Sequence, residues 1–144
     1  MRFKSLLLTV FCCCFWLMGT LWPADAIALT QIRLFDLSTQ ECPPEMAEGA
    51  VTSGGTSMPA NCYLIVGKAE NTSNKPVYNA DIFGRIYDAN NNSVMMNRTR
   101  LGSIDEVPIG VSDFQLRISV PANQPAPLKL EQFKATGFAG TVRR

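Results

Sequence analysis

Two cysteines carry the most specific chemistry in this sequence. Cys42 and Cys62 lie in the body of the chain, whereas the other three cysteines stand together at 12–14, inside an apolar N-terminal stretch. The N-terminal stretch resembles an export signal, and export favours oxidation of such a pair. We therefore predict a Cys42–Cys62 disulfide, which would stabilise the fold by about 3 kcal/mol by restricting the unfolded chain. Two reduced thiols, or a redox-switched pair, are the alternatives.

Residues suited to catalysis are scarce. The sequence contains no histidine, which excludes Ser-His-Asp and Cys-His catalysis and most zinc and copper sites. Carboxylates remain, but Asp105 and Glu106 fall in a predicted turn before Pro108, and Asp88 falls in another. Neighbours in sequence point apart on a strand, so neither set forms an acid/base pair unaided. We expect no enzymatic activity and no cofactor, with an uncharacterised hydrolase as the least favoured alternative.

An Asn-rich segment follows Asp88 and resembles the start of a calcium loop. Ser93 stands where such a loop requires glycine, and Thr99 occupies the twelfth position, where it requires glutamate. A β-turn over 88–92 therefore explains the segment better than a metal site. Three sequons, which begin at Asn71, Asn91 and Asn97, fit the glycosylation pattern, although an Asn-rich chain contains such matches by chance.

Two groups of side chains are candidates for a binding surface. An aromatic group could form an exposed patch on the second and third strands, or could instead pack under loops. The other group lies in a long loop at 38–61, which the predicted disulfide would tether. The candidate residues are Tyr63, Phe83 and Tyr87 for the patch, and Pro43, Pro44 and Met46 for the loop.

The N-terminal segment has the layout of a secretory signal. Arg2 and Lys4 precede an uncharged apolar run at 5–22, and small residues follow it. We predict a signal peptide over 1–28, with cleavage after Ala26 or Ala28. The alternative is an uncleaved anchor, since the run reaches the lower limit for spanning a bilayer. The protein is thus expected to be exported to the periplasm, the thylakoid lumen or the extracellular space.

The remaining residues, 29–144, have the size of one domain. Without the signal, the basic and acidic side chains balance at eleven each, and apart from the terminal Arg143-Arg144 no basic cluster survives. Nucleic-acid binding is therefore disfavoured, and so is adhesion to an anionic membrane by charge. Contact with a membrane is expected only through an uncleaved N-terminal segment.

Apolar residues recur with the period of β-strands, and turn residues separate the runs. At 113–120 the alternation is cleanest. A first or edge strand is expected at 32–37, and a helical turn near 45–48 in the loop. In the last strand the apolar side chains change from even positions, Leu128 and Leu130, to odd positions, Phe133 and Ala135. Because alternate residues of a strand face one side, we predict a β-bulge near Glu131-Gln132. The remaining predicted strands are 62–69, 77–87 and a polar edge strand at 94–101.

Six or seven short strands predict an all-β domain, a single antiparallel immunoglobulin-like sandwich with Greek-key connections. Three segments of the sequence, at 66–73, 84–88 and 108–114, resemble the motifs of FxLYD-type immunoglobulin-like domains, which read G-x-x-x-N-x-S, F-x-L-Y-D and P-G-x-S-x-x-F. The resemblance covers about half of the chain. Gly84 stands where the motif has its first Phe, Ile86 replaces the Leu, and Ile109 is inserted between Pro108 and Gly110.

The resemblance implies an exported sandwich module of the accessory or interaction type. Its signal and composition are also similar to those of small exported cyanobacterial proteins. We therefore expect a non-enzymatic module that binds another protein, such as an assembly or stability factor for a membrane complex. Open edge strands would offer a further contact. A small-ligand or carbohydrate-binding domain that uses the same aromatic residues is the alternative.

Overall fold

A computed structural model describes residues 29–52, 58–95 and 99–139; the predicted signal peptide lies outside them. Within these ranges no helix is long and apolar enough to cross a membrane. The elements, in chain order, are β1 (Leu29–Glu41), α2 (Pro44–Ala47), β2 (Ala60–Asn71), β3 (Val77–Tyr87), β4 (Arg100–Val107), β5 (Gly110–Pro121) and β6 (Lys129–Ala139).

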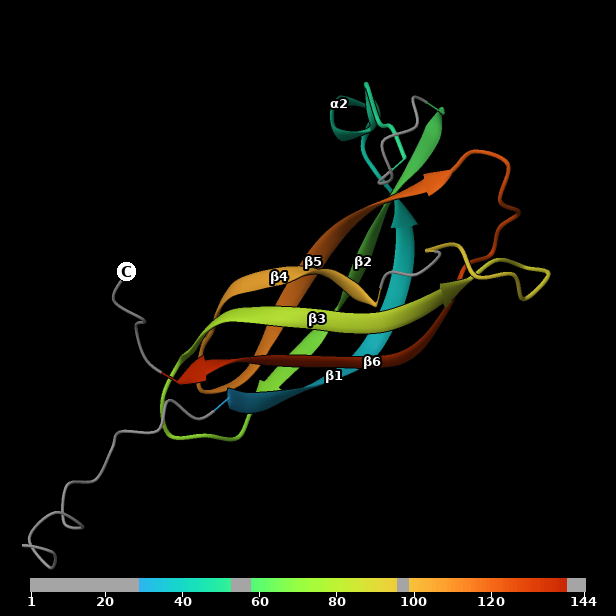
Figure 1. The fold of residues 1–144 in the computed structure, drawn as a ribbon. Coiled ribbons are helices and arrows are strands. Elements are labelled where there is room, and N and C mark those ends of the chain that lie inside the picture. Colours follow the sequence, from blue (N-terminus) through green and yellow to red (C-terminus); the bar gives the residue numbers. More distant parts are fainter. Residues whose placement is uncertain (1–28, 53–57, 96–98, 140–144) are drawn as a thin grey trace, which may run out of the picture.

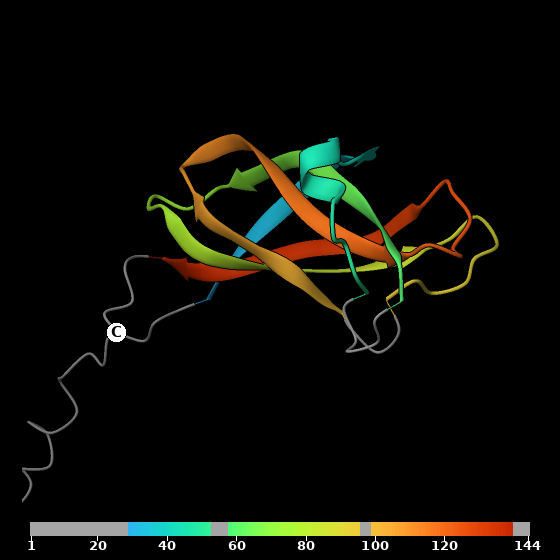
Figure 2. The same cartoon turned by 90° about the horizontal axis from the view of Figure 1, so that it is seen from above.

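The strands form one antiparallel sheet in the order β4-β3-β6-β1-β2-β5, which curls into a nearly closed barrel (Figures 1 and 2). The all-β antiparallel prediction is confirmed. The predicted sandwich would have two separate sheets. Here the two halves of one sheet, β4-β3-β6 and β2-β5, are joined by β1, which pairs with β6 through 29–32 and with β2 through 33–41. A strand that changes partner in this way forms the corner between two sheet layers.

Alternating apolar side chains from both halves fill the interior. The inward residues of β5 are buried as predicted, and so are those of β3, where Ile82 and Ile86 have no exposed surface. Burying one such side chain contributes about 1.5–3 kcal/mol. The inward residues of β5 are Phe114, Leu116, Ile118 and Val120.

The β-bulge predicted in the last strand is confirmed. Arg85 pairs with Glu131 and Phe83 with Lys134, so Gln132 and Phe133 together face the single residue Gly84. Gln132 has a φ of 56°. The bulge allows the inward side chains of β6 to change parity.

The position predicted for the fourth strand is wrong. Val94 is buried where the chain folds back on β3, and its N–H donates to the carbonyl of Ile86. In the sequence, its apolar side chain resembles the start of a strand. The strand that follows, β4, begins at Arg100 and lies at an edge as expected. Asp105 and Glu106 therefore belong to β4 and not to a turn.

The first strand is longer than predicted and is not at an edge. It lies between β6 and β2 and continues to Glu41, so the loop begins at Cys42 and not at Ser38. A bulge at Asp36 and Leu37 hides the continuation, because it shifts the side-chain parity halfway along the strand.

Candidate functional site

The disulfide closes the base of the loop between β1 and β2. These strands are antiparallel neighbours, and Glu41 pairs with Tyr63. Their pairing brings Cys42 and Cys62 together, with 5.3 Å between the Cα atoms and a bridge between the sulfur atoms. The Cys42 N–H also donates to the Cys62 carbonyl at 3.1 Å. The predicted pairing is confirmed, and its cause is the strand register.

A single helical turn, α2, follows Cys42, close to the position predicted for it. Pro44 begins the turn, where its fixed φ suits a helix and its missing N–H costs nothing. The N–H groups of Met46 and Ala47 donate to the Pro43 carbonyl. Gly49, with a φ of 72°, then redirects the chain.

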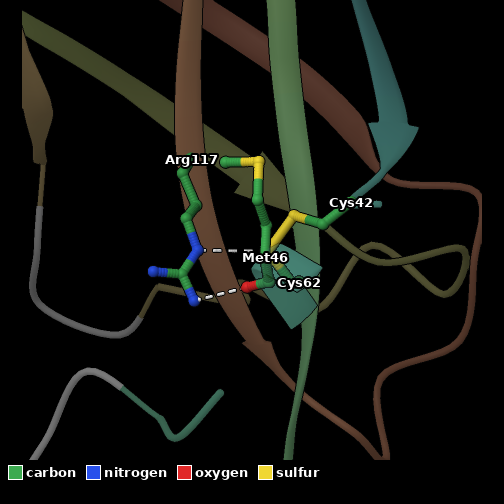
Figure 3. Close-up of a disulfide and its surroundings, with 4 residues drawn as sticks. All are labelled: Cys42, Met46, Cys62 and Arg117. Carbon is green, nitrogen blue, oxygen red and sulfur yellow. Dashed lines mark hydrogen bonds between the residues drawn. A yellow bond between two sulfur atoms is a disulfide. The ribbon is translucent and has the colours of Figure 1, made fainter. Parts of the chain in front are cut away.

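Arg117 fastens this turn to the disulfide (Figure 3). Its Nε donates to the Cys62 sulfur at 3.3 Å, and its terminal guanidinium nitrogen donates to the Met46 carbonyl at 2.8 Å. Arg117 extends outward from β5, opposite Leu64 on β2. The alternation of β5 predicts that Arg117 points outward. It does not predict the two hydrogen-bond partners of Arg117, because these depend on the pairing of β5 with β2.

The loop exposes apolar side chains from a backbone that hydrogen bonds hold in place. Val51 bridges to Pro59, and the Thr52 N–H donates to the Met58 carbonyl. Val51 is 56% exposed and Met58 50%. We name the following residues the tethered-loop surface: Pro43 and Pro44, which are exposed, Met46, which is half-buried, and Val51 and Met58.

The structure does not bring the three candidate aromatic residues together. Tyr63 is half-buried against the core, on the same parity of β2 as Ile65. Phe83 and Tyr87 lie on the parity of β3 opposite to the buried Ile82, and β6 and β1 separate β3 from β2. A patch shared by all three is therefore not formed.

Asn71 has a structural role that its sequon does not indicate. It is buried, and its amide group donates to the carbonyls of Lys75 and Val107, at 2.9 and 3.1 Å. Its oxygen accepts from the N–H and hydroxyl of Ser73. Both amide protons are thus used to hold the β2–β3 loop against the end of β4.

Asp88 is also buried, and it organises the turn after β3. Its carboxylate accepts the N–H groups of Asn90 and Asn92 at 2.8 Å and the side-chain amide of Asn92 at 3.1 Å. Burial raises the pKa of Asp88, but these hydrogen bonds and Lys129 outweigh it and hold the pKa below its ordinary value. The segment is a β-turn, as the sequence predicts.

Among the described residues, two open hollows each lie beside a bulge. One, of about 580 Å³, lies against Phe83, Gln132 and Lys134. The other, of about 570 Å³, contains Lys68 and Asp113, which form an ion pair at 2.9 Å. The Asp113 carboxylate raises the pKa of Lys68, so this hollow contains a solvent-exposed ion pair.

Comparisons with protein-family models, with curated proteins and with solved structures found no match. Within the described ranges, no group of three or more Cys, Asp or Glu side chains could hold a metal ion.

Proposed function

We propose that this protein is a non-enzymatic, exported protein-interaction module, of the kind that assists assembly or stability of a membrane complex. The observation that carries the proposal is the tethered-loop surface. Val51 and Met58 are each at least half exposed, on a loop that a disulfide and Arg117 hold in place. Binding to a fixed apolar surface costs less conformational entropy than binding to a free loop.

The position of the loop supports the same proposal. Leu29 pairs with Phe138, so the described chain begins and ends at one end of the barrel, and β1 leads from there to the loop at the other end (Figure 1). If the N-terminal segment stayed uncleaved as an anchor, the tethered-loop surface would therefore lie at the end of the barrel far from that anchor. The Met side chains suit contacts with another protein.

The FxLYD-type immunoglobulin-like assignment forms part of this proposal. Residues of its motifs have structural roles: Asn71 holds a loop, Asp88 holds a turn, and Gly110, with a φ of 90°, turns the chain into β5. Such roles suit a scaffold with functional residues elsewhere. Oxidation of Cys42–Cys62 supports export to the periplasm, the thylakoid lumen or the extracellular space.

A pull-down from detergent-solubilised membranes of the source organism tests the proposal. The bait is the full chain, in wild-type form and as the double variant Val51→Asp/Met58→Asp. The control bait is Ile109→Asp/Val111→Asp, since these side chains are equally exposed, 59% and 55%, and lie at the opposite end. We expect one set of proteins to be recovered with the wild type and the control but lost with the loop variant. Recovery of the same proteins by all three baits would contradict the role of the loop.

A further inference from the structure

The disulfide is asymmetric in the exposure of its two sulfur-bearing residues. Cys62 lies within β2 and is 5% exposed. Cys42 lies after the end of β1 and is partly exposed. An attacking thiolate must approach one sulfur along the S–S axis, so access favours attack on Cys42.

The charge around the disulfide is asymmetric in the same direction. The Arg117 guanidinium donates to the Cys62 sulfur at 3.3 Å (Figure 3). No such contact from a charged group to Cys42 occurs among the described residues. A thiolate released at Cys62 would therefore form next to a fixed positive charge, and a better-stabilised thiolate is a better leaving group.

We infer that Cys42–Cys62 is a directional site of thiol–disulfide exchange, open to a dithiol reductase of the Cys-X-X-Cys type. The attacking thiolate forms a disulfide with Cys42, the Cys42–Cys62 bond breaks, and its electron pair leaves with Cys62 as a thiolate beside Arg117. The second thiol of the partner then attacks the mixed disulfide. Both cysteines end as thiols and the partner's dithiol is oxidised to a disulfide, so two electrons are transferred.

Opening this bond would change the surface above it. The disulfide and the Arg117–Met46 hydrogen bond tie the first half of the loop to the barrel. Reduction removes the covalent tie. The remaining contacts of α2 are weaker, since α2 is a single turn and none of its residues is buried. The exchange chemistry itself does not depend on the proposed function, since it concerns only the sulfur atoms and Arg117.

Chemical trapping in the full chain tests the direction of exchange. Any free thiols at 12–14 are first blocked with iodoacetamide under non-reducing conditions. Reduced glutathione then opens the disulfide briefly, and a second addition of iodoacetamide quenches the reaction. Peptide mass spectrometry should find glutathione on Cys42 and the alkyl group on Cys62. Glutathione mainly on Cys62, or equally on both cysteines, would overturn the inference.

The rate of opening tests the role of Arg117. We expect Arg117→Gln to be opened about tenfold more slowly by glutathione, because the leaving thiolate loses its positive neighbour, and Arg117→Lys to recover most of the rate. Arg85→Gln is the matched control, since Arg85 is exposed and lies on β3, in the other half of the sheet. Equal rates for the wild type and Arg117→Gln would contradict the charge argument.

Release of the loop has its own measurement. Glu45 and Glu48 are exposed in and after α2, so a glutamate-specific protease reports on this segment. After reduction and alkylation, we expect faster cleavage at these two residues, while Glu106 in β4 and Glu131 in β6 stay uncut. Unchanged cleavage after reduction would show that the loop stays in place without its disulfide, and would overturn the release step alone.

Discussion

The ring of Phe133 on β6 occupies the space over Gly84 on β3. A Cβ atom at position 84 would lie 2.6 Å from Cδ2 of Phe133, closer than carbon atoms can approach. An aromatic ring from the neighbouring strand thus fills the place of a side chain at position 84, which glycine does not supply. The bulge at Gln132 and Phe133 makes this placement possible, since it turns Phe133 inward.

Gly84→Ala should therefore lower the free energy of unfolding by about 1–3 kcal/mol, because the added methyl group overpacks the site. Urea denaturation of both proteins measures the difference. In the Phe133→Leu background the same substitution should cost less, since the two positions share one space. Equal costs in the two backgrounds would show that the two side chains do not compete.

A bulge that faces a glycine, as at Gly84, occurs at three places in the described sheet. In each, the first bulged residue has a positive φ and the residue facing the bulge is a glycine, whose absent side chain leaves room for the bulged strand. The pairs are Asp36 with Gly67, Asn79 with Gly137, and Gln132 with Gly84.

Gln132→Gly should stabilise the protein by about 0.5–1 kcal/mol, because glutamine tolerates a φ of 56° less well than glycine. Lys134→Gly on the same strand serves as the control. Lys134 is also exposed but has no positive φ, so there glycine should destabilise by about 0.5–1 kcal/mol. Destabilisation by both substitutions would show that the backbone at Gln132 is not strained.

Removal of the disulfide by Cys42→Ser/Cys62→Ser should lower the free energy of unfolding by about 3 kcal/mol, since the unfolded chain regains the freedom of the loop. Mass spectrometry of the wild type after alkylation, with and without reductant, provides the companion measurement. Reductant should expose two more alkylation sites, and an unchanged count would reject the disulfide.

Asp88 should make the stability of the protein depend on pH in the acid range. Because folding holds the pKa of Asp88 below its ordinary value, its contribution is present above the unfolded value, about 4, and is lost as the pH falls through the folded value. Asp88→Asn, which cannot accept the same set of hydrogen bonds, should have a lower Tm than the wild type at pH 7.

That difference in Tm should narrow as the pH falls from about 4 through the lowered pKa of Asp88, below which the wild-type carboxylate is itself protonated. Thermal melts across the acid range measure it. Asp113→Asn is the matched control, because Asp113 is exposed and its ion pair with Lys68 lies at the surface, where such a pair contributes little. A difference for Asp88→Asn that does not change with pH would indicate a steric cause.

The sequence by itself determined the local features of this protein. The alternation in β5, the bulge in β6, the turn after Asp88 and the pairing of Cys42 with Cys62 could all be predicted, because each follows from side-chain parity, turn chemistry or the count of available cysteines. Predictions from side-chain parity were wrong where a bulge interrupts β1, and where Val94 is buried without starting a strand.

Only the tertiary structure decided which distant side chains meet. Tyr63 and Phe83 lie on consecutive strands, for which the sequence suggested one shared patch, yet β1 and β6 separate these strands. Arg117 reaches the Cys62 sulfur because β5 pairs with β2, and Phe133 covers Gly84 because β6 pairs with β3. Strand order is set by how the whole core packs and not by local preference, so a single sequence pattern does not contain it.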